Sequence, residues 1–456
     1  MFSLVITIPL LFLCVVLLFT ARSHEQRQRV IEDLSLPPNT KTLAFFHPYC
    51  NAGGGGERVL WTAIAYIQRT RPEVLPVVYT GDIDATKDSI VQKAQSRFSI
   101  ALDPDRLHFV FLTRRVLVED STYPHFTLIG QSMGSVGLVL EALWNFVPHA
   151  YIDTMGYAFT LPILRILGIP AGAYVHYPTV SPPMISRVAR PSKLVYYHAF
   201  MLLYSLALRC AQVLMVNSTW TRKHVAAVLA YPFSSSRRGT IKPRVVYPSC
   251  DTREMAKLPL DARAQVVVSI AQFRPEKDHA MQIRALHSLL QTHPKYEKVQ
   301  LVLIGGCRNE QDQARVTALE NLAVELGVKE HVTFVLNAPY PDVLAWLRRA
   351  SVGLNTMLDE HFGINVVEFM AAGVIPIVHA SGGPLEDIVV PFNGKNTGYH
   401  AKSPETFAAA IHEAFSLSPA EDREIRRRAR TWAVQQFSEA EFEAGWEASG
   451  WAKLLR

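Results

Sequence analysis

The chain has 456 residues, 49% of them apolar and 19% charged, so it is too long and too rich in core-forming side chains to be disordered, and long enough for two or three domains. Its mean hydropathy of +0.11 is too low for a protein made of many membrane spans. The charge excess, 46 − 40 = +6, is small and dispersed, which argues against a nucleic-acid partner. The five cysteines form no CxxC pair, which argues against a disulfide framework or a structural zinc site.

The first segment, residues 1–20, carries no charged side chain and as a helix would reach about 30 Å, the thickness of one bilayer core. Arg22, Arg27 and Arg29 follow it, so the positive-inside rule places the body of the protein in the cytoplasm. A cleaved signal peptide normally has a basic start and a shorter apolar stretch. The sequence therefore predicts a single-pass anchor over residues 1–21.

Between residues 40 and 250, apolar runs typical of buried strands alternate with helical patterns, as in a parallel sheet covered on both faces. The expected strands are Thr42–His47, Val77–Thr80, His108–Leu112, Ala150–Asp153, Gly172–His176 and Val213–Asn217. A longer apolar run over 194–216 contains His198, Arg209 and Gln212, which argue against a full span. It is either a buried helix followed by a core strand or a helix lying in the membrane interface.

A polar, proline-containing stretch within 231–262 predicts a hinge, after which the alternation restarts and fills residues 260–430. The expected strands are Val266–Ala271, Gln300–Ile304, Val332–Val335, Val352–Asn355 and Ile375–Val378, and the expected helices are 278–292, 311–326, 341–350, 363–372 and 404–416. A final helical stretch, 420–453, is long enough for its end, 431–456, to cross back to the first domain. The predicted fold class is α/β, with two Rossmann-like domains facing a cleft.

The first candidate site is the glycine run Gly53–Gly56, which follows a strand and precedes a helix. Bare N–H groups at a helix N-terminus form a cradle for an anion. The run fits neither the GxGxxG pattern nor the P-loop pattern. Four consecutive glycines exceed what close strand–helix packing needs, which favours a functional loop.

Arg274 and Lys277 form the second candidate site, at the end of the first strand of the second half. Two cations so placed can bind a diphosphate, although a surface loop with solvated cations would look the same. The third site pairs Glu360 with Glu368, with Glu360 on a loop and Glu368 two turns down the next helix. Carboxylates there can bind sugar hydroxyls, and the N–H groups of Gly363–Val366 can bind phosphate.

Two further features have mainly structural interpretations. Asp82 and Asp84 match the DxD pattern that binds metal in one large class of sugar-nucleotide enzymes, but aspartate also suits a turn, which we favour here. His176 ends an expected strand, where it is either structural or a polar group near a reacting sugar.

The segment from Glu360 to Glu368 resembles the E-x7-E motif of the retaining GT-B glycosyltransferases of family four, as do the run AAGVIPIVHASGGPLEDIV that follows and the Arg274/Lys277 pair. The runs HPYCNAGGGGERVLW and VHYPTVS, with the N-terminal anchor, narrow this resemblance to the dolichol-pathway α-1,2-mannosyltransferases. The resemblance implies transfer of the fourth and fifth mannoses from GDP-mannose to a dolichol-linked oligosaccharide. It places the enzyme at the cytoplasmic face of the endoplasmic reticulum membrane, alongside other mannosyltransferases of the pathway and without a metal or other cofactor.

The resemblance also implies roles for individual residues. Arg274 and Lys277 would neutralise the donor diphosphate, Glu360 would bind the mannose ring, Glu368 would bind the ribose, and His176 would lie beside the sugar. The remaining donor-binding residues implied are Gly53, Gly54, Gly55, Gly56, Gly305, Phe362, Gly363, Ile364 and Asn365. His361 departs from the glycine that many relatives carry. The alternatives are a family-four mannosyltransferase with another lipid acceptor, a non-catalytic GT-B assembly partner, and a soluble glycogen- or sucrose-type synthase, which would leave the anchor unexplained.

Overall fold

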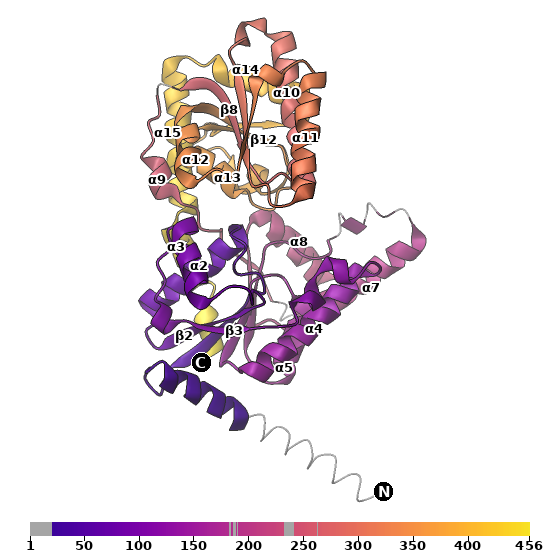
Figure 1. The fold of residues 1–456 in the computed structure, drawn as a ribbon, viewed down its shortest axis with the longest axis vertical. Coiled ribbons are helices and arrows are strands. Elements are labelled where there is room, and N and C mark those ends of the chain that lie inside the picture. The colour runs from indigo at the N-terminus through magenta and orange to yellow at the C-terminus, as the bar shows by residue number, and fades with distance from the viewer. Residues whose placement is uncertain (1–20, 182–183, 186–187, 189, 232–240, 262) are drawn as a thin grey trace, which may run out of the picture. The chain divides into compact units, whose positions relative to one another are not determined.

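The protein is described by a computed structural model that covers residues 21–181, 184–185, 188, 190–231, 241–261 and 263–456. The described chain divides into two compact units (Figure 1). The first extends to Val216 and includes Arg222–Val246 and Glu443–Arg456, and the second consists of Asn217–Thr221 and Tyr247–Phe442. The expected anchor over residues 1–21 lies outside the described residues except for Ala21.

The first unit is built on a seven-stranded sheet in which every neighbouring pair is parallel, in the order β3-β2-β1-β4-β5-β6-β7. Its strands are β1 Lys41–Phe46, β2 Val74–Thr80, β3 His108–Phe111, β4 Ala150–Asp153, β5 Ala171–Val175, β6 Val213–Val216 and β7 Arg244–Val245. The expected parallel sheet is confirmed. The two-residue strand β7 was not expected, because it is too short to show a pattern.

Helices cover both faces of this sheet, which is why its strands are apolar on both sides. The helices that begin in this part of the chain are α2 Gly55–Thr70, α3 Lys87–Phe98, α4 Thr127–Asn145, α5 Leu161–Ile166, α7 Pro191–Leu208 and α8 Thr219–Ala230. The apolar run 194–216 contains most of α7 and all of β6. The expectation of a core strand is confirmed, because β6 is buried throughout.

The second unit has a six-stranded parallel sheet in the order β10-β9-β8-β11-β12-β13. Its strands are β8 Ala264–Ile270, β9 Gln300–Gly305, β10 Val332–Leu336, β11 Ala350–Asn355, β12 Ile375–His379 and β13 Tyr399–Ala401. Successive residues of β8 face opposite sides: Val267 packs with α10 and α14, whereas Val266 and Val268 pack with α12 and α13. The two Rossmann-like units predicted from the sequence are therefore present.

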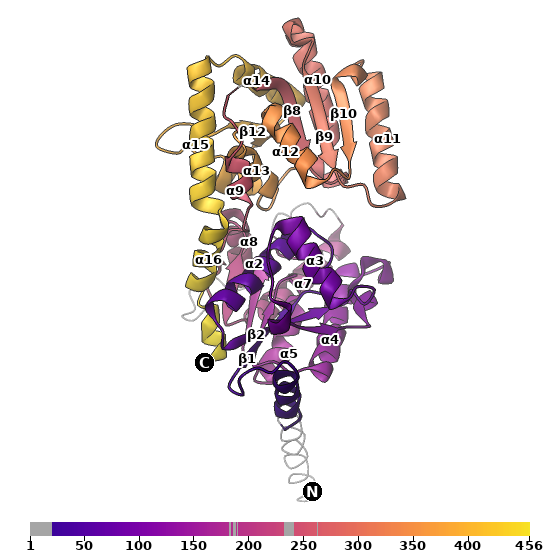
Figure 2. The ribbon, with the colours of Figure 1, turned by 60° about the vertical axis from the view of Figure 1, so that its left-hand side comes forward.

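The helices of this half follow the expected positions closely, and Figure 2 shows α15 and α11 on opposite sides of the sheet. They are α9 Thr252–Ala256, α10 His279–Thr292, α11 Glu310–Glu325, α12 Tyr340–Arg349, α13 Ile364–Ala371, α14 Pro404–Phe415, α15 Pro419–Phe437 and α16 Glu439–Ala448. The final stretch is not one helix. It breaks at Ser438, whose extended backbone (φ −67°, ψ 166°) ends α15 before α16 begins.

The end of the chain completes the core of the first unit. Trp446 of α16 is fully buried, with its ring 6.3 Å from that of Phe45 in β1 and 6.5 Å from that of Tyr174 in β5. Trp451 is also fully buried. Helix α16 therefore packs against strands from the first half of the sequence.

Among the described residues, no helix combines the length and the hydropathy that a membrane crossing would require. In α7, Phe200, Met201 and Tyr204 are buried, whereas Val195 and Leu206 are exposed. The helix thus contributes one face to the core and leaves apolar side chains on the other.

Candidate active site

In the second unit the structure brings together a lysine and a glutamate from the ends of two adjacent strands. Lys277 ends the 3₁₀ turn Pro275–Lys277 after β8, and Glu360 lies on the loop after β11. Lys277 Nζ is 2.5 Å from Glu360 Oε2, and the two side chains are 25% and 12% exposed. The pair is therefore largely withdrawn from water but still accessible at the carboxyl edge of the sheet, where α/β proteins bind ligands.

Asparagines from neighbouring elements fix the position of this carboxylate. Asn355 Nδ2, at the end of β11, donates to Glu360 Oε2 at 3.5 Å and to Asn365 Oδ1 at 3.1 Å. Asn365 Nδ2 donates in turn to the carbonyl of Ile270 at 3.0 Å. Both bonds to the carboxylate use Oε2, so Oε1 of Glu360 accepts no hydrogen bond from the described residues and can accept one from a ligand.

Arg274 and Gly305 lie at the same edge but do not join the Lys277–Glu360 pair. The guanidinium of Arg274 is 43% exposed, and its ion-pair partner is Glu276, at 3.9 Å. Gly305 ends β9, where a Cβ atom would collide with the carbonyl of Ala271. This glycine is required for close backbone packing, whatever else it contacts.

The helix that follows Glu360 begins with a glycine in a conformation that other residues rarely adopt. Gly363 has φ +112° and precedes the first residue of α13, Ile364. Glu368 is the fifth residue of α13, so it lies little more than one turn from the helix start, rather than the two turns expected. Phe362 is buried against Tyr247, with ring centroids 5.8 Å apart, so only its backbone remains available to a ligand.

A glycine loop within the run AAGVIPIVHASGGPLEDIV supports the backbone of Glu360. Gly383 N–H donates to the carbonyl of Glu360 at 2.8 Å, and a Cβ at Gly383 would lie 2.8 Å from the backbone of Phe362. Two backbone segments can approach this closely only without a side chain between them. The ring of His361 stacks on that of Trp220, with centroids 5.8 Å apart.

In the first unit the glycine loop leads from β1 into α2. Gly53 has φ +82°, and Gly54 is the N-cap residue of the 16-residue helix. A Cβ at Gly56 would lie 3.5 Å from Nε2 of His176, so the structure brings the loop and this histidine together. Gly55 is exposed and Gly56 is partly exposed, and their N–H groups at the start of the helix are suited to bind an anion.

A buried polar network below this loop was missed by the sequence analysis. Glu57 accepts a hydrogen bond from Gly54 N–H and lies 3.3 Å from Nε2 of His47. His47 Nδ1 lies 2.8 Å from the hydroxyl of Thr154, and His176 Nε2 donates to the Thr154 carbonyl at 3.2 Å. Burial alone would raise the pKa of Glu57, but the hydrogen bond and charge of His47, with the Gly54 N–H, hold it below its usual value.

Asp153 precedes Thr154 of this network in the sequence and is completely buried. Its Oδ1 accepts backbone N–H groups from Met155 at 3.1 Å, Gly156 at 2.5 Å and Tyr157 at 3.1 Å. Burial raises the pKa of Asp153 to about 6 although these three donors lower it. The carboxylate thereby fixes the backbone turn that follows β4.

The DxD pattern has the contacts of a structural turn. Asp82 forms an ion pair with Arg115 and accepts the N–H of Asn51 at 2.9 Å, whereas Asp84 is exposed. Both oxygens of Asp82 are thus bonded within the protein. Within the described residues, no group of three or more metal-ligating side chains is positioned to hold a metal ion.

Comparisons with known proteins identify the families that the two halves of the chain match. Residues 40–229 match the ALG11 mannosyltransferase N-terminus family, and residues 251–432 match glycosyl transferases group 1. The chain is similar to solved structures of Anabaena Alr3699/HepE in complex with UDP and glucose (TM-score 0.61, 16% identity, 90% of this chain and 98% of that one) and of sucrose-phosphate synthase from Thermosynechococcus elongatus (TM-score 0.62, 19% identity, 90% and 98%). The two parallel-sheet Rossmann-like units have the GT-B fold of these neighbours, and the two family matches identify the chain as a glycosyltransferase.

Curated relatives identify the family of glycosyltransferases to which the chain belongs. The human GDP-Man:Man(3)GlcNAc(2)-PP-Dol alpha-1,2-mannosyltransferase is 44% identical over 92% of this chain and 88% of its own length. Proteins with the same name from Mus musculus (96% and 93% covered) and Caenorhabditis elegans (89% and 90% covered) are 44% and 40% identical. The chain belongs to this family of α-1,2-mannosyltransferases.

Proposed function

We propose that this protein transfers mannose from GDP-mannose, in α-1,2 linkage and with retention of configuration, to dolichol-diphosphate-linked Man3GlcNAc2, adding the fourth and then the fifth mannose. The observation that carries the proposal is the Lys277–Glu360 pair, held in place at the strand ends of a chain that is 44% identical to relatives of that name. The other lipid acceptors considered from the sequence lack such support.

The pair has hydrogen-bonding capacity left for the donor. The Lys277 ammonium has three N–H groups, and the described residues engage it at Glu360 and at Met357 Sδ, 3.2 Å away. Its third N–H can meet a phosphate oxygen, while Oε1 of Glu360 accepts from a mannose hydroxyl. We assign Arg274 to the same diphosphate because its guanidinium is half exposed and its ion-pair partner among the described residues, Glu276, is as far as 3.9 Å away.

Charge stabilisation is the main contribution expected from the chain. GDP leaves as a diphosphate anion, and cations and N–H groups aimed at that charge lower the barrier. We infer that the acceptor hydroxyl attacks the anomeric carbon on the face from which GDP leaves, and that its proton passes to a diphosphate oxygen. On this path the N–H groups of Gly363–Asn365 serve the diphosphate, Glu368 binds the ribose, and no metal is needed. For the first unit, the family resemblance assigns the N–H groups of Gly55 and Gly56 to an anion and His176 to a sugar.

We also propose that the first unit rests on the cytoplasmic face of the endoplasmic reticulum membrane, anchored by residues 1–20. Trp144 at the end of α4 is 68% exposed and Val195 in α7 is 70% exposed; Met133, Leu140, Leu203 and Leu206 of the same helices are also exposed. The guanidinium of Arg22, two residues beyond the apolar segment, lies 4.1 Å from the Trp144 ring. The anchor would therefore enter the bilayer beside these apolar side chains.

Product analysis of the full-length protein in detergent tests the activity. With GDP-mannose and dolichol-linked Man3GlcNAc2 we expect products lengthened by one and then two mannoses, both removed by α-1,2-mannosidase. Glu360→Ala should abolish transfer, whereas Glu297→Ala, an equal change at an exposed position, should not. Transfer to dolichol-linked ManGlcNAc2 instead, or no transfer, would contradict the proposal. For the membrane contact, Leu206→Glu in a chain without residues 1–20 should reduce flotation with anionic vesicles.

A further inference from the structure

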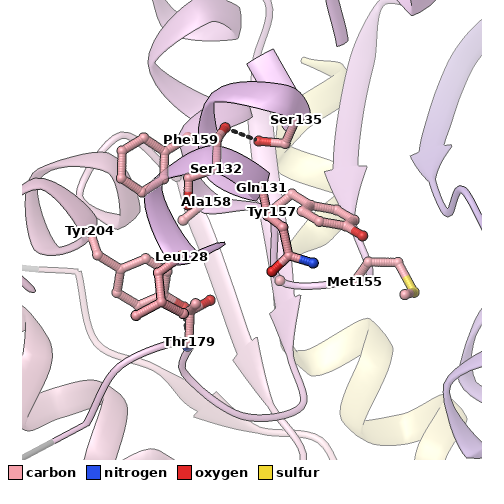
Figure 3. A pocket seen from close by; sticks show the side chains of 11 residues that line it. Leu128, Gln131, Ser132, Ser135, Met155, Tyr157, Ala158, Phe159, Thr179 and Tyr204 are labelled. Carbon is pink, nitrogen blue, oxygen red and sulfur yellow. Dashed lines mark hydrogen bonds between the residues drawn. The ribbon is translucent and has the colours of Figure 1, made fainter. Parts of the chain in front are cut away.

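The first unit contains a cavity of about 200 Å³ whose lining includes none of the residues assigned to the donor. It lies between α4, α7 and the turn that follows β4 (Figure 3). In this view Phe159 and Tyr204 lie on one side and Gln131, Tyr157 and Met155 on the other. The volume is below the range of about 300–1,000 Å³ typical of sites for drug-sized ligands, so it suits a single small ring.

The lining of the cavity combines aromatic rings with neutral hydrogen-bonding groups. Gln131 donates through Nε2 to the carbonyl of Val118 at 2.9 Å, and the Tyr157 hydroxyl makes no hydrogen bond with the described residues. The Tyr204 hydroxyl accepts the N–H of Thr179 at 3.3 Å, and burial raises its pKa to about 12, so it stays protonated and can donate.

This composition excludes several ligand classes. No described residue that lines the cavity is charged, so it offers no counter-charge to a nucleotide or a diphosphate. An isoprenoid chain would offer no hydrogen bond to the polar side chains of Gln131, Tyr157 and Thr179. A neutral sugar suits both features, because its hydroxyls pair with amides and hydroxyls while its C–H faces pack on aromatic rings.

The cavity lies at the edge of the sheet that carries the reacting groups of this unit. Strands β1, β4 and β5 are parallel neighbours, so their carboxyl ends lie at one edge. The glycine loop follows β1, His176 follows β5, and the lining residues Met155–Phe159 follow β4. Thr154, next to Met155 in the chain, bonds to both His47 and His176.

We propose that this cavity is an acceptor subsite that holds one mannose residue of the lipid-linked glycan. The inference rests on the proposed function and names the part of the acceptor that the first unit recognises. The turn that Asp153 holds in place forms part of the lining of the subsite. At Gly156 in this turn the space beside the backbone is empty, since a Cβ there would meet no atom within 4 Å.

The test compares Gln131→Leu and Tyr157→Phe with the wild-type, full-length enzyme. Initial rates are measured against dolichol-linked Man3GlcNAc2 and, separately, against GDP-mannose. For each variant we expect the acceptor KM to rise about 5- to 10-fold, the effect of one lost hydrogen bond, with the GDP-mannose KM unchanged within about twofold. Tyr157→Phe removes only a hydroxyl, so it keeps the ring packing on Phe46. Gln291→Leu, the same change at an exposed position of α10, should leave both KM values unaltered.

Each other outcome contradicts the subsite. Unchanged acceptor KM values in folded Gln131→Leu and Tyr157→Phe would show that the cavity is not used. A rise in the GDP-mannose KM, with faster or slower hydrolysis of GDP-mannose in the absence of acceptor, would show that the cavity holds the donor sugar instead. Failure of the proposed function is distinguishable, because the wild-type enzyme would then transfer no mannose to this acceptor.

Discussion

Replacing Lys277 by methionine separates the electrostatic role of this residue from its packing. Methionine preserves the length of the apolar stem beside Met357 and removes only the ammonium group. Two consequences follow from the structure: the donor diphosphate loses a cation, and Glu360 loses its ion-pair partner. The two effects differ in size and are measured independently.

The stability cost should be modest. The two side chains are 25% and 12% exposed, and Asn355 remains as a donor to the carboxylate after the change. A partly exposed ion pair contributes about 1 kcal/mol, and the carboxylate left with less compensation adds about 1 kcal/mol. A loss of about 2 kcal/mol is small beside the roughly 5–15 kcal/mol that stabilises a domain, so the variant should fold.

The catalytic cost should be much larger. Removing one preorganised group that stabilises developing negative charge typically lowers kcat by about 10² to 10³, or about 3–4 kcal/mol. Single-turnover transfer to dolichol-linked Man3GlcNAc2 at saturating GDP-mannose measures this, and thermal unfolding reports the stability. Lys298→Met, at an exposed position, is the matched control. A folded Lys277→Met enzyme with a kcat within threefold of the wild-type value would refute the assigned role.

Three other changes test the surrounding structure. Glu57→Gln should lower the unfolding free energy at pH 7 by about 1–2 kcal/mol. Folding lowers the pKa of Glu57, so the stabilisation by this carboxylate is present above the usual pKa of glutamate and is lost as the pH falls through the lowered pKa. The free energy of unfolding of the variant, measured with denaturant, should therefore depend less on acid pH than that of the wild type. Gly383→Ala should displace the loop of Glu360 and lower kcat by about tenfold or more, since a Cβ would lie 2.8 Å from backbone atoms; normal kcat would show that the loop can yield without cost. Excess EDTA should leave transfer unchanged, and complete loss of activity would return Asp82 and Asp84 to consideration.

The sequence predicted the strands well where buried parallel pairing makes them continuously apolar, as in Val266–Ile270. It did not predict β7 and β13, of two and three residues, because so few residues carry no periodicity. The Ser438 break was missed because helical periodicity continues on both sides of it. These differences arise where tertiary contacts, rather than local patterns, determine the backbone.

The candidate site residues also divide into those that local sequence patterns predict and those that depend on tertiary contacts. Lys277 and Glu360 follow separate strands, and the rule that parallel strand ends share an edge was enough to bring them together. The partnership of His47 with Thr154 spans 107 positions and depends on β1 pairing with β4, which no local motif encodes. Gln131 and Tyr204 come from helices whose apolar patterns gave no sign of a cavity between them.

The burial of Trp446 against β1 and β5 also has a consequence for how the protein is made. A ribosome exposes the strands of the first unit long before it synthesises this tryptophan, so Phe45 and Tyr174 lack this partner until α16 has been made. The first unit can therefore complete its core only after α16 has left the ribosome. Translation halted anywhere before α16 should leave an unfinished sheet for chaperones to hold, however much of the second unit has already folded.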